Sequence, residues 1–262
     1  MSDRREIEAI VNESGNTFHC RVANYLRGKG WYTLISPYYM DSATGKPREI
    51  DLIAEKSWYV GAQFFNEKHG FIIIKLFVEC KYISQPNVFW FSDKDVASAK
   101  QWVATNTPLR GDDYSISKHH YLAKPKVAKL FASRNRPNTE GEVIYRALNQ
   151  SLNAVVSMRW KGSINQEFRG QGMPVFATVE MPTILCNSFA DFYRVEIDDP
   201  DQPKPIDDNF ELEVNYAYLD DQKNNKTEYF LIDIVDFEKL DGFLSILEAD
   251  VAAILSILRF RR

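Results

Sequence analysis

The spacing of apolar side chains predicts one helix and three strands in the first third of the chain. Phe18, Val22 and Leu26 recur at helical intervals, and Gly28 follows as a stop signal. β-Branched and aromatic residues then dominate three short segments. These predicted strands cover residues 31–36, 49–55 and 71–82. The pattern indicates a sheet with a helix packed beside it.

The remaining pattern alternates helices with strands. Helices are expected at residues 93–105, 140–158 and 237–260, the first of them capped by Ser92 or Asp93. Strands are expected at residues 175–179, 184–186, 192–197, 210–219 and 228–235. This order predicts an α/β (α+β) fold with a central mixed sheet flanked by helices. We expect one elaborated domain over residues 1–262, with a catalytic half in residues 1–105 and a second half, residues 106–262, that completes and extends the sheet.

The composition is that of a globular protein, but it does not indicate what the protein binds. Apolar residues make up 45% of the chain, which is ample for a buried core. The net charge of −4 is weak evidence about nucleic-acid binding, because many DNA-cutting enzymes bind through a local basic face. Cys20, Cys80 and Cys186 are far apart and odd in number, which predicts a reduced, cytoplasmic environment. No apolar segment reaches the roughly 18 residues that a membrane span needs, so no membrane association is expected.

Two of the predicted strands carry charges among apolar residues. Asp51 stands in the second strand, and Glu79 and Lys81 stand two residues apart in the third. Since side chains alternate along a strand, Glu79 and Lys81 share one face and Cys80 points to the other. Charges in such surroundings are costly unless they have partners. If the strands are neighbours, two carboxylates and one ammonium converge, an arrangement that can bind Mg²⁺ (or Mn²⁺) and that suits phosphodiester hydrolysis.

These residues resemble the PD-(D/E)XK signature of restriction-endonuclease-like nucleases. Ile50 and Asp51 match its degenerate first half, and Glu79, Cys80 and Lys81 match its second half. The opening helix adds to the likeness through the spacing of Phe18, Val22, Leu26, Gly30 and Trp31. Methyl-directed restriction enzymes and archaeal Holliday-junction resolvases show the same helical pattern. The resemblance, which covers roughly residues 13–82, implies metal binding by Asp51, Glu79 and the backbone carbonyl of Cys80, with Lys81 orienting or deprotonating the attacking water.

One position departs from the family pattern. The helical glutamate of the family would fall at His19, which is not a carboxylate. In one alternative, Glu13 takes over as the outer metal ligand. In another, His19 itself binds the metal or a phosphate. In a third, the helical position is dispensable or the site has lost its activity.

A second candidate surface is the basic segment, residues 115–139. It carries six lysines and arginines and two histidines but no acidic residue. The candidate substrate contacts in it are Lys118, His119, Lys124 and Lys126. A phosphate-contact surface and a plain solvated loop both fit this composition. No further His or Cys stands at zinc spacing near His119 and His120, so a zinc site is not expected.

The sequence therefore predicts a metal-dependent nuclease, an endonuclease that hydrolyses phosphodiester bonds in nucleic acid, with DNA as the expected substrate. Cleavage of two strands favours a homodimer. Two alternatives stay open. The first is a catalytically inactive module on the same fold that binds nucleic acid or protein, which His19 and the negative net charge favour. The second is an accessory protein that acts through protein contacts alone.

Overall fold

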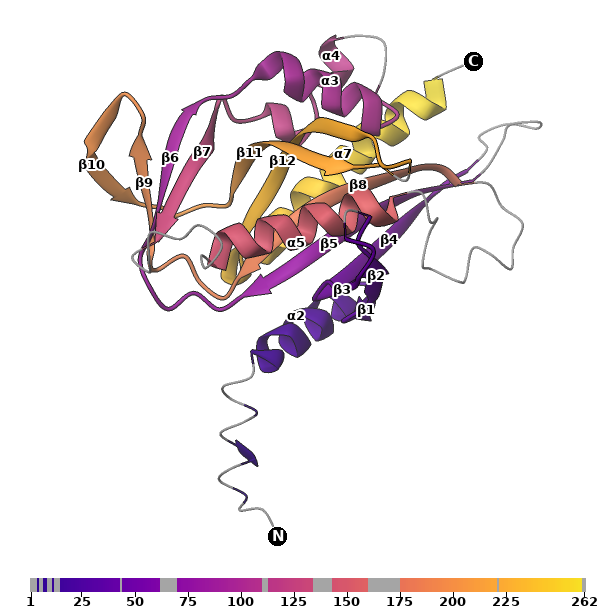
Figure 1. The fold of residues 1–262 in the computed structure, drawn as a ribbon. Coiled ribbons are helices and arrows are strands. Elements are labelled where there is room, and N and C mark those ends of the chain that lie inside the picture. The colour runs from indigo at the N-terminus through magenta and orange to yellow at the C-terminus, as the bar shows by residue number, and fades with distance from the viewer. Residues whose placement is uncertain are drawn as a thin grey trace.

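The computed structural model describes residues 4, 7–8, 11, 15–42, 44–61, 70–109, 113–133, 143–159, 175–220 and 222–260. Within these ranges, ten strands form one mixed sheet in the order β1-β4-β5-β8-β12-β11-β7-β6-β9-β10. Two further strands, β2 and β3, pair only with each other. Helices lie on both sides of the sheet (Figure 1). The predicted class, a mixed sheet flanked by helices, is confirmed.

The N-terminal elements follow the predicted order with one addition. They are α2 (Asn16–Gly28), β1 (Tyr32–Ile35), β2 (Tyr38–Met40), β3 (Pro47–Glu49), β4 (Leu52–Val60) and β5 (Gly70–Lys81). The β2–β3 hairpin was not expected. The second predicted strand also begins later than the sequence suggested, so Asp51 lies in a bend just before β4 and not inside it.

In the middle of the chain, the predicted cap of one helix is wrong. Helix α3 spans Val96–Asn106, and the Asp95 side chain caps it by accepting a hydrogen bond from the Ser98 N–H. Ser92 and Asp93 cannot serve as caps because β6 (Asn87–Asp93) continues through both. The basic segment contributes to α4 (Asp113–Ile116), η1 (His120–Leu122) and β7 (Lys126–Ser133). Its residues 134–139 lie outside the described residues.

One long strand replaces two predicted ones. After α5 (Val143–Met158), β8 (Val175–Cys186) runs without a break through Pro182. β8 pairs with β5 along almost its whole length, but its pairing with β12 begins only at Thr183. Pro182 therefore stands where β8 has a partner on one side only, a place where a missing N–H is tolerated.

The C-terminal part adds five elements and a short 3₁₀ turn. They are β9 (Phe192–Glu196), β10 (Asp199–Pro205), β11 (Phe210–Leu219), β12 (Asn225–Asp236), η3 (Phe237–Lys239) and α7 (Leu240–Phe260). β10 was predicted as a break between strands, because its residues are all charged, polar or proline. It is an exposed edge strand, which needs no apolar face. Within the described ranges, no helix is long and apolar enough to cross a bilayer.

Two apolar layers enclose the sheet. Residues of α5 pack with Phe77 of β5 on one face. Residues of α2, α3 and α7 pack with Val78 and Cys80 on the other face. Figure 1 shows α5 crossing one side of the sheet and α7 lying on the opposite side. The alternation expected along β5 is confirmed, since neighbouring residues enter different layers.

Candidate functional site

The register of β4 against β5 places Asp51 beside Glu79. Leu52 pairs with Val78, so Asp51, one residue earlier, lies level with Glu79, and residues opposite each other share a face. The Asp51 carboxylate also accepts a hydrogen bond from the Cys80 N–H at 2.8 Å. Strand pairing and this hydrogen bond together hold the Asp51 carboxylate against the C-terminal end of β5.

Lys81 joins the two carboxylates. Its Nζ lies 2.7 Å from Glu79 Oε2 and 3.5 Å from Asp51 Oδ2. The Glu79 side chain is fully buried, whereas Lys81 and Asp51 keep 18% and 14% of their side-chain surface exposed. A substrate can therefore approach Lys81 and Asp51, with Glu79 behind them. The three residues singled out by the sequence are brought together.

Glu79 has an unusual electrostatic setting. Burial raises its pKa, Lys81 opposes that rise and Asp51 adds to it, and the net result is a pKa of about 8. Among the described residues, no group donates a hydrogen bond to the buried Glu79 Oε1. A cation beside that oxygen would lower the pKa again, because an opposite charge favours the ionised carboxylate. The site thus has a carboxylate oxygen that fits a metal ion.

The pKa of Lys81 is also set by burial and by the neighbouring charges. Burial lowers its pKa, but the charges of Glu79 and Asp51 outweigh burial, and the net direction is upward. Lys81 is therefore held as an ammonium. In that form it can donate hydrogen bonds to a phosphate or to a water, but it cannot accept a proton.

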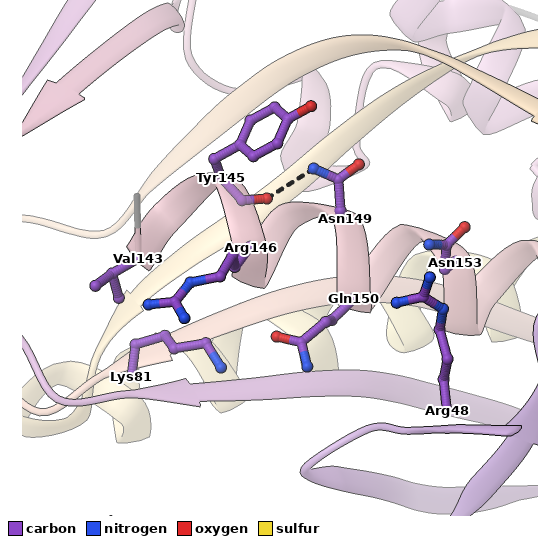
Figure 2. A pocket seen from close by; sticks show the side chains of 8 residues that line it. All are labelled: Arg48, Lys81, Val143, Tyr145, Arg146, Asn149, Gln150 and Asn153. Carbon is purple, nitrogen blue, oxygen red and sulfur yellow. Dashed lines mark hydrogen bonds between the residues drawn. The ribbon is translucent and has the colours of Figure 1, made fainter. Parts of the chain in front are cut away.

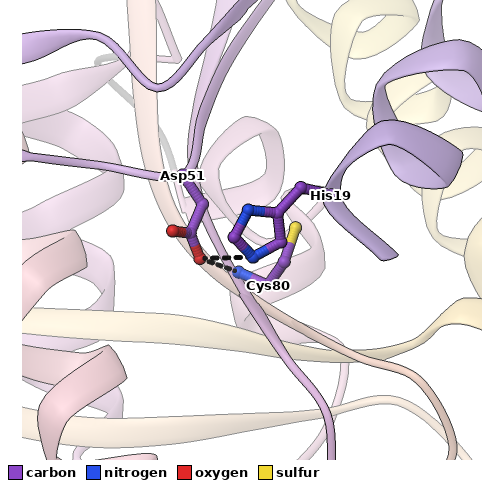
Figure 3. A group of neighbouring side chains, drawn as sticks. All are labelled: His19, Asp51 and Cys80. Carbon is purple, nitrogen blue, oxygen red and sulfur yellow. Dashed lines mark hydrogen bonds and ion pairs between the residues drawn. The ribbon is translucent and has the colours of Figure 1, made fainter. Parts of the chain in front are cut away.

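His19 reaches the same carboxylate from α2. Its Nε2 lies 3.4 Å from Asp51 Oδ2. Figure 3 shows His19, Asp51 and Cys80 as one group, and their potential ligand atoms lie within 4.8 Å of one another. Mn²⁺ accepts an imidazole beside carboxylate oxygens more readily than Mg²⁺ does, because Mg²⁺ is bound through oxygen. Glu13, the other candidate for this position, lies outside the described residues.

The Cys80 side chain is a poorer metal ligand than the Cys80 backbone carbonyl. Burial raises the pKa of the Cys80 thiol well above its ordinary value, so the sulfur stays protonated within the apolar layer. In a strand, the N–H and C=O of one residue point to the same side. Because the Cys80 N–H faces Asp51, its carbonyl faces the Asp51 side as well. The carbonyl ligand implied by the resemblance is thus compatible with the backbone.

A polar pocket opens beside Lys81. It has a volume of about 690 Å³ and lies between β5 and α5 (Figure 2). Its lining residues are Arg48, Lys81, Val143, Tyr145, Arg146, Asn149, Gln150 and Asn153. Apart from Lys81, the sequence analysis missed all of them. The available signal was a polar stripe at positions 146, 149, 150 and 153, on a helix whose other positions are mostly apolar.

The basic segment is not brought to this site. β7 is separated from β5 by three strands in the sheet order, which amounts to about 19 Å at the usual strand spacing. Lys124 and Lys126 form ion pairs with Asp208 and Glu196, at 2.7 Å and 2.6 Å. Lys118 lies over the ring of Tyr114. Lys126 is therefore remote from Asp51, and the paired Lys124 and Lys126 are locally neutralised. His119 is fully buried beside Asp250, so it cannot contact a substrate.

A second cluster of ionisable groups surrounds His120. The imidazole lies between two carboxylates, with Nδ1 hydrogen-bonded to Asp250 and Nε2 3.3 Å from Asp233. Burial lowers the pKa of His120, but the two aspartates outweigh burial and raise it to about 10. His120 is therefore an imidazolium that links η1, β12 and α7. This cluster escaped the sequence analysis, because its partners are remote along the chain.

His119 lies beside this cluster in the opposite charge state. Burial lowers its pKa to about 3, so the ring is neutral. The Tyr121 N–H donates to His119 Nδ1 at 3.3 Å, which leaves the ring proton on Nε2. Potential ligand atoms of His119, His120 and Asp250 lie within 4.8 Å of one another, but both ring nitrogens of His120 are already engaged with carboxylates. The hydrogen bonds thus indicate a structural cluster.

Comparison with known proteins adds no relative. No family model, curated protein or solved structure matches the chain. A function for the site has to be argued from its own geometry and chemistry.

Proposed function

We propose that the protein is a metal-dependent nuclease that hydrolyses phosphodiester bonds in DNA, with Asp51, Glu79 and Lys81 as its catalytic residues. The observation that carries the proposal is their convergence at one end of β4 and β5. A buried carboxylate oxygen that lacks a hydrogen-bond donor among the described residues adds support. Lys81 and Asp51 are also partly exposed, so a substrate can reach them.

The residues fit a hard divalent cation. Asp51, Glu79 and the Cys80 carbonyl would hold Mg²⁺ or Mn²⁺ through oxygen atoms. When bound, such a cation neutralises charge on the scissile phosphate and lowers the pKa of a coordinated water. The Cys80 N–H keeps the Asp51 carboxylate oriented through its 2.8 Å hydrogen bond. His19 adds a nitrogen donor at the edge of this set.

Besides the cation, the proposed site has a positive charge from the protein itself, the ammonium of Lys81. Held as an ammonium by Glu79 and Asp51, it donates a hydrogen bond to the attacking water or to a non-bridging phosphate oxygen. Preorganised donors of this kind stabilise the negative charge that develops in the transition state. The burial of Glu79 keeps water away from the rear of the site, which strengthens these interactions.

A cleavage assay tests the proposal directly. Supercoiled plasmid, single-stranded DNA and branched DNA are incubated with Mg²⁺, Mn²⁺ or EDTA, using the wild-type protein, Lys81→Ala and Lys126→Ala. We expect metal-dependent cleavage that Lys81→Ala abolishes and Lys126→Ala retains, since Lys126 is paired with Glu196 far from the site. Cleavage by a pure Asp51→Ala/Lys81→Ala double variant would contradict the assignment.

One observation favours a second candidate, an inactive module that binds nucleic acid. Lys81 already forms ion pairs with both carboxylates, so the cluster can persist without a metal. His19 also stands where the families that the sequence resembles have a carboxylate. This candidate predicts salt-dependent DNA binding by a well-folded protein, with neither a metal requirement nor cleavage.

A further inference from the structure

The pocket beside α5 carries an inference that rests on the proposed nuclease function. Lys81, one of the proposed catalytic residues, forms part of the pocket wall. Figure 2 shows Arg146 and Gln150 turned toward Lys81, with Arg48 and Asn153 at the other end. The pocket is therefore continuous with the place where a phosphodiester would be cut.

The polar groups of this pocket retain hydrogen-bonding capacity. Within the described ranges, neither the Arg146 guanidinium nor the Gln150 carboxamide has a side-chain hydrogen bond or an ion pair. Asn153 Oδ1 accepts from the Tyr216 hydroxyl at 2.8 Å, and the amide nitrogen of Asn153 makes no hydrogen bond within the same ranges. Lys124 and Lys126 differ, because both are already paired with acids. The pocket is thus better suited than the basic segment to an anionic ligand that also carries hydrogen-bonding groups, such as the base edge of a nucleotide.

The shape of the pocket decides between paired and unpaired bases. Base edges in a duplex lie at the floor of a groove, the major one about 12 Å wide, and are read by elements that project into it. Arg146, Gln150 and Asn153 line a concave surface instead. Bases that have left the stack, in single strands or flipped nucleotides, enter pockets whose polar groups hydrogen-bond to their exposed edges. A volume of about 690 Å³ suits a ligand of small-molecule size.

We propose that this pocket receives one unpaired nucleotide next to the scissile phosphate. Arg146 contacts the phosphate of that nucleotide, while Gln150 and Asn153 hydrogen-bond to the edge of its base. Lys81 contacts the neighbouring, scissile phosphate. The preferred substrate is accordingly single-stranded or locally unpaired nucleic acid, and an intact duplex is disfavoured because its bases cannot enter.

Binding measurements without cleavage test this proposal. Fluorescence anisotropy in EDTA compares a labelled single strand of about 12 nucleotides, a length within the usual range of single-strand sites, with its duplex and with the same sequence in RNA. We expect tighter binding of the single strands than of the duplex. Arg146→Ala and Gln150→Ala should each weaken single-strand binding about five- to tenfold. The matched control Arg194→Ala, on β9 near the far edge of the sheet, should change it less than twofold, an order-of-magnitude bound for a residue outside the site.

Equal affinity for single strand and duplex, or unchanged affinity in both α5 variants, would overturn the proposal. Arg146 is exposed, so its replacement is not expected to disturb folding. Gln150→Glu provides a second variant, in which a negative charge should repel the strand. Preference for either single-stranded polymer meets the expectation, and the stronger of the two identifies the sugar.

An abasic scan locates the nucleotide. One nucleoside at a time is replaced by an abasic sugar along the single strand, and the binding of each strand is measured. We expect a loss of affinity confined to one or two positions, and no such loss with Gln150→Ala. A uniform response at all positions would show that the pocket reads no base.

The result of the binding measurements can be distinguished from that of the nuclease assay. Single-strand binding that depends on Arg146, without cleavage in any metal, would refute the nuclease and retain the pocket. Metal-dependent cleavage that treats duplex and single strand alike and ignores Arg146→Ala would retain the nuclease and refute the pocket.

Discussion

Two clusters of charged groups in this protein use similar residues in different ways. At the end of β5, Lys81 lies between Glu79 and Asp51. Under α7, His120 lies between Asp233 and Asp250. In both clusters one cation stands between two carboxylates. They differ in what surrounds them.

The His120 cluster is closed. His120 uses both ring nitrogens on carboxylates, and its backbone N–H donates to Asp250 as well. Asp233 also accepts a hydrogen bond from the Tyr121 hydroxyl. Each member thus has its partners within the protein, and the groups tie three elements together. Such a network contributes to the structure and offers a ligand little to bind.

The Lys81 cluster is open. Lys81 and Asp51 are partly exposed, Lys81 borders a pocket, and Glu79 Oε1 has no hydrogen-bond donor among the described residues. Spare capacity next to an accessible pocket is typical of a binding or catalytic site. The comparison teaches that buried charge alone does not distinguish function from architecture, whereas unsatisfied groups facing a pocket do.

The largest expected effect is on catalysis. Asp51→Asn should lower the rate of DNA cleavage by about 10²–10⁴-fold, the range that a positioned catalytic group contributes. It removes the proposed metal-binding charge while keeping the size of the side chain. Initial rates measured with Mg²⁺ and Mn²⁺ test this, and circular dichroism verifies folding. A variant with unimpaired cleavage would remove the open cluster from the mechanism.

A substitution in the closed His120 cluster should lower the stability of the protein. Asp250→Ala should reduce the free energy of unfolding by about 3–5 kcal/mol, because it leaves a buried imidazolium with one carboxylate fewer. Urea titration measures the loss. Glu248→Ala is the control on the same helix, since its exposed ion pair with Lys56 contributes about 1 kcal/mol or less. A loss as small as that of the control would mean that the His120 cluster is not structural.

The pH dependence of stability should change with His119. Its folded pKa of about 3 lies below the value of 6.5 for an unfolded histidine, so the unfolded state binds the proton first. Stability contributed by the neutral, buried ring is present above pH 6.5 and is lost as the pH falls toward 3. His119→Gln should therefore flatten the acid limb, by up to about 1.4 kcal/mol for each pH unit. Identical slopes in the two proteins, from urea titrations across this range, would contradict the neutral assignment.

The smallest effect is expected at the edge of the open cluster. His19→Ala should lower cleavage about tenfold, in the range seen when a group supporting a metal site is removed. Cys20→Ala, an exposed neighbour on the same helix, should leave cleavage unchanged. His19→Glu should shift the preference from Mn²⁺ toward Mg²⁺, because an oxygen donor replaces a nitrogen donor. Equal rates for the wild-type protein and His19→Ala would show that the helical position is dispensable.

Much of the core near the open cluster was predictable from the sequence. The helical spacing of Phe18, Val22 and Leu26 predicted α2, and these residues are buried. The β-branched and aromatic run predicted β5, and period-two alternation placed Glu79 and Lys81 opposite to Cys80. Such features depend on neighbours within one element, where the backbone repeat alone decides which side chains share a face.

The pairing of distant charges depended on the tertiary structure. His120 and Asp250 are separated by 130 residues, and Lys124 and Asp208 by 84. The basic segment has no acid of its own, yet β9, β11 and the loop before β11 supply acids that neutralise three of its lysines, Lys124, Lys126 and Lys129. Composition within a segment therefore predicted a basic surface that the folded chain partly cancels.

What the sequence by itself determined was the set of reactive groups and their sidedness on each strand. What only the tertiary structure decided was which of those groups remain available. The register of β4 on β5 brought Asp51 to Glu79, and the packing of α5 over the same face built a pocket beside Lys81. The physical reason is that periodicity is a local property of the backbone, whereas burial and charge compensation depend on contacts between segments that the chain keeps far apart until it folds.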